Sequence, residues 1–111
     1  EKAHEEGATF VLTNAPIAMR MGEINGLAEK TNSKIIPADA TSVEELTNLF
    51  TESQQILGGK IDFVLHSIGM SVNIRKKIAY PELNYDYYAK GVDVSAMSLH
   101  KMLSVAYNMD A

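Results

Sequence analysis

Cysteine is absent from this sequence, which excludes a disulfide framework and any metal site built on thiolate ligands. The three histidines, His4, His66 and His100, stand far apart in the chain, so we expect no metal site of any kind. The absence of cysteine and the presence of six methionines agree with a reducing, cytoplasmic environment.

Long hydrophobic runs and a surplus of basic residues are also lacking. The longest apolar runs have four or five residues, whereas a helix that spans a bilayer needs about 20. Ten Lys and Arg residues stand against 14 Asp and Glu residues, which gives a formal net charge of −4, and the basic residues are scattered. Proteins that bind nucleic acid usually carry a basic stripe. We therefore expect a soluble, cytoplasmic protein whose partners are neither a membrane nor a nucleic acid.

The length of 111 residues and the hydrophobic content of 46% suffice for one core and no more. Residues 1–7 read as the end of a helix stopped by a glycine, and helical periodicity is still running at residue 111. We expect one domain, or a piece of one that is cut at both ends.

Strand and helix patterns alternate along the chain. Short β-rich or wholly apolar runs predict strands at residues 9–13, 34–39 and 61–68. Apolar residues at helical spacing predict helices at 18–31, 43–57 and 85–111, with a loop between the third strand and the last helix. This order predicts an α/β fold with a parallel sheet and right-handed crossovers.

Two segments carry especially clear signals. Ser42 and Glu45 form a possible capping box before an apolar helical face, and Gly58 and Gly59 follow that face as a stop. The run 61–68 is apolar on both faces, as strands covered on both sides of a parallel sheet tend to be.

Polar groups stand where each predicted strand ends, at residues 13–16, 38–41 and 66–71. Ligands of open parallel sheets bind at the carboxyl ends of the strands. Asp39 could accept a hydrogen bond from a ligand or cap its own helix, and capping is the commoner role. His66 could act as a proton donor, but a core histidine bonded to a backbone carbonyl is the commoner case.

Several motifs together resemble those of the short-chain dehydrogenases/reductases. These are Gly7-Ala8 with Thr13, then Asp39-Ala40, then His66-Ser67-Ile68-Gly69, in the order and at about the spacing of that family. The His-Ser-Ile-Gly tetrad is specifically similar to the NADH-dependent enoyl-acyl-carrier-protein reductases of bacterial type II fatty-acid synthesis. Residues 93–98, Asp-Val-Ser-Ala-Met-Ser, are similar to the start of the long helix in those enzymes.

The resemblance implies a Rossmann-like, doubly wound parallel sheet. It is an incomplete one, since the first strand and the C-terminal half of the fold are missing, so residues 1–111 would be part of a dinucleotide-binding domain. The missing strand would lie between the strands at 9–13 and 61–68 and leave a gap there.

The resemblance also implies seven cofactor-binding residues: Asn14, Ala15, Asp39, Ala40, Ser67, Ile68 and Gly69. Asn14 and Ala15 would flank the adenine ribose. Asp39 would contact the adenine amino group, and Ala40 would contact the ring through its backbone. Residues 67–69 would run under the ribose and the pyrophosphate, with a glycine at 69 because a side chain would collide with the dinucleotide.

The implied cofactor is NADH, and the implied substrate is an enoyl thioester on acyl carrier protein. Met70 and Ser71 would border the acyl pocket. No acidic residue near Asn14 stands ready to hold a ribose 2′-hydroxyl, so the preference for NADH over NADPH rests on the resemblance alone. The full-length enzyme would be a homo-oligomer, a tetramer.

No catalytic residue is expected in this chain. The glycine-rich turn of the family belongs before residue 1 and its Tyr-x6-Lys pair after residue 111, and none of the five tyrosines stands in that register. Asp93 occupies the position at which the wider family has a catalytic Asn. We expect the 111-residue chain by itself to be inactive.

Two other functions remain open from the residues. One is another short-chain reductase, of the 3-oxoacyl type. The other is a non-catalytic module of flavodoxin-like or receiver type, which would need clustered carboxylates at the strand ends, where only Asp39 stands. The basic run 75–77 is either a solvated loop, the commoner case, or a contact for the acidic carrier protein.

Overall fold

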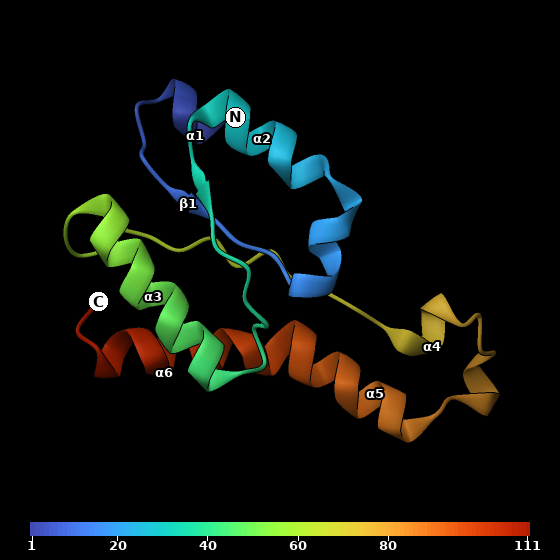
Figure 1. The fold of residues 1–111 in the computed structure, drawn as a ribbon. Helices are drawn as coiled ribbons and strands as arrows, with labels where there is room; N and C mark the ends of the chain where they lie inside the picture. The colour runs from blue at the N-terminus through green and yellow to red at the C-terminus, as the bar shows by residue number, and fades with distance from the viewer.

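The structure is a computed structural model that describes residues 1–111, apart from the side chain of Met21. The chain is elongated, with principal extents of 49 × 32 × 22 Å. Helices α1 (Lys2–Glu5) and α2 (Glu23–Thr31) lie on one side of the strands. Helices α3 (Val43–Leu57) and α6 (Ser98–Asn108) pack together on the other side (Figure 1).

The two strands form a parallel pair, as predicted. Strand β1 (Val11–Leu12) lies beside β2 (Lys34–Ile35), with Val11 opposite Lys34 and Leu12 opposite Ile35. The hydrogen bonding continues past both strands, since Ile36 N donates to Leu12 O at 2.9 Å and Ala38 N donates to Asn14 O at 3.0 Å. This continuation carries the pairing to the carboxyl ends and sets residue 14 beside residue 38.

The prediction of a third, buried strand at residues 61–68 is wrong. This segment passes behind β1 without joining the sheet (Figure 1), and Phe63, Val64 and Leu65 are 61%, 52% and 82% exposed. A strand forms only when its N–H and C=O groups bond to those of a neighbour, and no such neighbour lies beside it in the described part of the chain. An open hollow of about 670 Å³ separates residues 7–13 from residues 60–65.

Helix α3 forms where the sequence predicted it. Ser42 Oγ accepts a hydrogen bond from Glu45 N at 3.2 Å, and Gly58 ends the helix at φ +81°, a left-handed conformation that favours glycine. In a full capping box the Glu45 side chain would accept from Ser42 N. Here Ser42 N instead donates to Asp39 O at 3.0 Å.

The apolar face of α3 supplies the centre of the core. Leu46 is fully buried and Phe50 nearly so. They belong to a cluster with the buried residues Ile36, Ala38, Leu49, Met102 and Val105, which come from the end of β2, from α3 and from α6. This packing holds the carboxyl end of β2 against the long C-terminal helix.

The helix predicted at 18–31 begins later than expected. Residues Pro16–Met21 form the 3₁₀ helix η1, and Gly22 separates it from α2 at φ +75°. That left-handed conformation cannot continue a right-handed helix. Helix α2 then ends at Asn32, the predicted stop, at φ +50°.

The C-terminal helix is long, as predicted, and widens in the middle. Helix α5 (Tyr85–Val92) runs into a π-helical stretch, η3 (Asp93–Met97), which runs into α6. The preceding loop contains the short helices α4 (Val72–Arg75) and η2 (Tyr80–Glu82). No helix among the described residues is long and apolar enough to cross a bilayer.

Candidate functional site

The carboxyl ends of β1 and β2 lie side by side. Asn14 is exposed, its backbone oxygen accepts from Ala38 N, and its Oδ1 accepts from Ala15 N at 2.9 Å. Asp39 follows Ala38 directly. The sheet therefore brings the predicted ribose contact at Asn14 and the predicted adenine contact at Asp39 to one edge.

Asp39 does not cap helix α3, so the commoner role expected for it is wrong. Its Oδ1 instead accepts two hydrogen bonds from Thr41, one from the backbone N at 2.9 Å and one from Oγ1 at 2.7 Å. The backbone hydrogen bond is the largest cause that lowers the pKa of Asp39, followed by the hydroxyl bond and by the charges of Lys90 and Lys101. The carboxylate is therefore ionised near neutral pH and acts only as an acceptor.

His66 is a structural residue, but its partner differs from the one expected. Its Nε2 lies 2.8 Å from the hydroxyl of the fully buried Ser98, not beside a backbone carbonyl. The Ser98 hydroxyl donates its proton to Val94 O at 2.7 Å. With that proton directed to Val94 O, Ser98 Oγ is left to accept, an arrangement that suits a His66 tautomer with its hydrogen on Nε2.

Helix α5 and the π-helical stretch hold the backbone after His66. Met70 N donates to Ser95 Oγ at 2.9 Å, and Ser95 Oγ lies 3.2 Å from Met70 O, to which it donates. Gly91 leaves room for this approach, since a Cβ there would lie only 3.1 Å from Met70 O. These contacts fix where the segment 66–71 turns away from the sheet.

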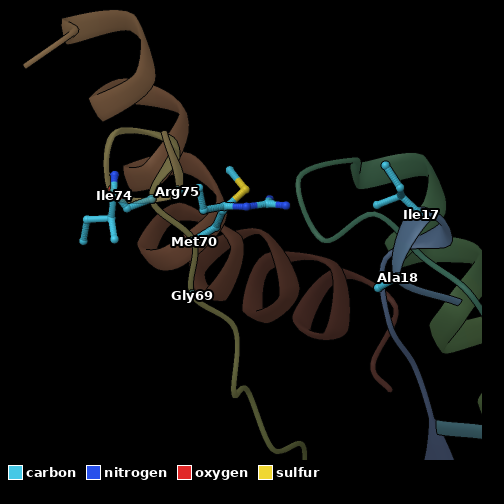
Figure 2. A pocket seen from close by; sticks show the side chains of 7 residues that line it. Ile17, Ala18, Gly69, Met70, Ile74 and Arg75 are labelled. Carbon is cyan, nitrogen blue, oxygen red and sulfur yellow. The ribbon is translucent and has the colours of Figure 1, made fainter. Parts of the chain in front are cut away.

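An open hollow of about 780 Å³ lies between this segment and η1. Figure 2 shows the side chains of Met70 and Arg75 facing Ile17 and Ala18 across it. Its lining is mainly apolar and consists of Ile17, Ala18, Gly69, Met70, Ser71, Ile74 and Arg75.

Three of the predicted residues, Gly69, Met70 and Ser71, line this hollow, and the other predicted residues do not. Ser67 is exposed, whereas Ile68 is half-buried and packs against the core cluster. The Ser71 side chain also caps α4 by accepting from Ile74 N at 3.3 Å.

Within the described residues, no group of three His, Cys, Asp or Glu side chains is placed to hold a metal ion. A receiver-type site requires carboxylates grouped at the strand ends, and Asp39 is engaged with Thr41 instead.

A sequence profile of the family described as "Enoyl-(Acyl carrier protein) reductase" matches residues 1–110. The chain belongs to the enoyl-acyl-carrier-protein reductase family. This membership agrees with the parallel pair β1–β2 and with the placement of the segment 66–71 on the long helix.

Solved reductases of this family contain the fold of this chain as part of their own. Two crystal structures of FabI from Alistipes finegoldii, one of them a complex with NADH, are 55% identical to this chain with TM-scores of 0.94 and 0.95. They match 99% of this chain, which spans 41% and 39% of theirs. The Bacillus cereus enoyl-acyl-carrier-protein reductase with NADP⁺ and indole naphthyridinone is 27% identical, with a TM-score of 0.77 over 93% of this chain and 40% of that chain.

A curated relative is more distant. An uncharacterized oxidoreductase of Staphylococcus aureus strain MRSA252 is 36% identical over 70 residues, which is 63% of this chain and 29% of that protein. The chain thus spans well under half the length of its enoyl-reductase relatives and of this oxidoreductase.

The residues that hold the segment 66–71 in place were not predicted from the sequence. Ser95 and Ser98 were noticed only as part of a family motif, although their spacing of three places them on one helix face. Gly91 and Lys101 gave no signal in the sequence, because their contacts with residues 70 and 41 depend on the fold.

Proposed function

We propose that this chain is part of an enzyme that reduces the enoyl double bond of acyl-carrier-protein thioesters with NADH in type II fatty-acid synthesis. The observation that carries the proposal is the 55% identity, over 99% of the chain, to a FabI crystallised with NADH. Residues 1–111 would then be part of its dinucleotide-binding domain.

In this proposal the adenosine half of NADH lies along the ends of β1 and β2. Asn14 and Ala15 flank the adenine ribose, the ionised Asp39 accepts a hydrogen bond from the adenine amino group, and Ala40 contacts the ring through its backbone. Support comes from the hydrogen bond that joins Ala38 to Asn14 and from the low pKa of Asp39. A negatively charged acceptor suits an amino donor.

The ribose and pyrophosphate side would pass over residues Ser67, Ile68 and Gly69. A Cβ at Gly69 would meet no protein atom within 4 Å, so the fold itself does not demand a glycine there. In the proposal, a dinucleotide that lies close to this backbone is the reason for the glycine.

Met70 and Ser71 would border the acyl substrate in the hollow beneath η1. The apolar side chains of Ile17, Met70 and Ile74 around this hollow suit a hydrocarbon chain. The cofactor would supply the hydride that reduces the enoyl group. The residues of this chain would orient the two reactants and exclude water, whereas the groups that polarise the thioester carbonyl would belong to another part of the enzyme.

The proposed partners are acyl carrier protein and further copies of the enzyme, in the cytoplasm. Arg75 borders the hollow, and the basic Lys76 and Lys77 follow it directly in the sequence, which supports a contact with the acidic carrier protein. The proposal includes a tetramer, for which the exposed apolar side chains of the long helix, Val92, Met97, Leu99, Leu103 and Tyr107, would be available as subunit contacts.

The test is NADH oxidation by the full-length protein with a 2-enoyl thioester of acyl carrier protein. We expect turnover with the enoyl thioester and slower turnover with NADPH. Turnover of a 3-oxoacyl thioester, and not of the enoyl thioester, would indicate the other short-chain reductase instead. Residues 1–111 alone should show no turnover with either substrate, because they lack the Tyr-x6-Lys pair.

A further inference from the structure

Lys101 joins two turns of the long C-terminal helix to the loop after β2, which is distant in sequence. Its Nζ donates to the backbone oxygen of Thr41 at 3.0 Å and to Asp93 Oδ1 at 2.7 Å. The Lys101 and Asp93 side chains are only 26% and 37% exposed, so the ammonium has exchanged part of its hydration for these two oxygens. Helix α6 is thereby tied both to the π-helical stretch and to the loop after β2.

The connection continues from Thr41 to Asp39. The backbone N and the hydroxyl of Thr41 both donate to Asp39 Oδ1. The N–H, the hydroxyl and the carbonyl of Thr41 are thus each held by a hydrogen bond, which restricts the orientation of this residue as a whole. Within the described residues, neither of these bonds uses Asp39 Oδ2, which leaves that oxygen for an outside donor.

We propose that Lys101 is a positioning residue for the dinucleotide, which holds Thr41 so that Thr41 aims the Asp39 carboxylate at the adenine amino group. The inference rests on the proposed function, since Asp39 needs the adenine to be there. Lys101 itself touches no cofactor atom and acts only through Thr41 and Asp39.

Lys90 offers a matched control for the charge of Lys101. Both lysines lower the pKa of Asp39 by their charge. Lys90 is exposed on α5 and acts on Asp39 through space, whereas Lys101 also holds Thr41 by a hydrogen bond. Removing either charge changes the electrostatic field at Asp39, but only removing Lys101 releases the loop.

The experiment compares Lys101→Met and Lys90→Met in the full-length protein. Dissociation constants are measured for NADH and for nicotinamide hypoxanthine dinucleotide, which carries a carbonyl oxygen where adenine has its amino group. We expect Lys101→Met to weaken NADH binding about five- to tenfold, in line with the loss of one ordinary hydrogen bond, and to reduce the preference for NADH over the analogue. Lys90→Met should change both constants by less than about twofold, and kcat at saturating NADH should stay the same in both variants.

Different results would overturn the proposed function and the positioning role of Lys101. If the wild-type protein binds no NADH, the proposed function is overturned and this inference with it. If the wild type binds NADH and Lys101→Met keeps the full preference, or if both variants weaken binding equally, the positioning role alone is overturned. Should Lys101→Met fold poorly, Thr41→Val removes the hydroxyl bond to Asp39 and must reduce the same preference.

Discussion

The side chain of Ser95 forms hydrogen bonds with both the backbone N–H and the backbone C=O of Met70. The serine hydroxyl accepts from Met70 N at 2.9 Å and donates to Met70 O at 3.2 Å, across 25 positions of sequence. One side chain therefore bonds to the N–H and the C=O of the same residue, as a neighbouring strand does in a β-sheet. It satisfies both backbone groups of Met70 just before the chain enters α4.

Replacing Ser95 by alanine should loosen this segment. Two partly buried backbone groups would lose their partner, so we expect the free energy of unfolding of the full-length protein to fall by about 1–3 kcal/mol. Because Met70 borders the proposed acyl pocket, the Michaelis constant for the enoyl thioester should also rise. Urea denaturation and steady-state kinetics measure the two effects. Ser104→Ala, at an exposed serine of α6, is the control and should change neither.

Two glycine-to-alanine substitutions should have opposite effects. A Cβ at Gly91 would lie 3.1 Å from Met70 O, a carbonyl that Ser95 holds in place, so Gly91→Ala should destabilise the protein by about 1 kcal/mol or more. A Cβ at Gly26, inside α2, would meet nothing within 4 Å, so Gly26→Ala should stabilise it by about 0.5–1 kcal/mol. Thermal unfolding of both variants checks this. Equal shifts of the two midpoints would contradict the close approach at Gly91.

Asp39 should make stability depend on pH in the acid range. Its pKa in the folded protein lies below the ordinary value of 3.8, so the folded state favours the ionised form. This contribution is present above pH 3.8 and is lost as the pH falls through the lower, folded-state pKa. Asp39→Asn should therefore be less stable than the wild type at neutral pH, and the difference should shrink in acid. Urea denaturation at several pH values measures it, with the exposed Asp62→Asn as the control, whose difference should stay small at every pH.

Charge reversal of Arg75, Lys76 and Lys77 tests the proposed contact with acyl carrier protein. These three side chains are exposed, and Arg75 borders the hollow proposed for the acyl chain. The triple glutamate variant of the full-length enzyme should raise the Michaelis constant for the carrier-bound thioester several-fold, because repulsion weakens encounter with an acidic partner. The constant for a small enoyl thioester should stay unchanged. Equal increases for both substrates would instead assign the run to the acyl site.

Much of the secondary structure followed from local residues. The bounds of α3 were readable because Ser42 and Gly58 act within one turn of the helix ends. Gly22 in the sequence indicated the late start of α2, but the apolar spacing on both sides of it led to the prediction of one helix from residue 18. The parallel pairing of β1 and β2 followed from the helix between them, because a crossover returns the chain in the same direction.

The side-chain partners at the site did not follow from the sequence. Ser98 lies 32 positions from His66, and Thr41 lies 60 positions from Lys101, so no local pattern indicates either contact. Asp39 stands just before α3 in the sequence, and only the fold shows that its carboxylate accepts from Thr41.

The sequence by itself determined helix α3, the long C-terminal helix, the parallel β1–β2 pair and the family, because these depend on neighbouring residues and on short motifs. Only the tertiary structure showed that residues 61–68 pair with neither described strand and that Asp39 turns to Thr41. The physical reason is that an apolar run indicates only that its side chains favour burial. A strand or a polar contact forms only where a second segment supplies the matching hydrogen-bond donors and acceptors.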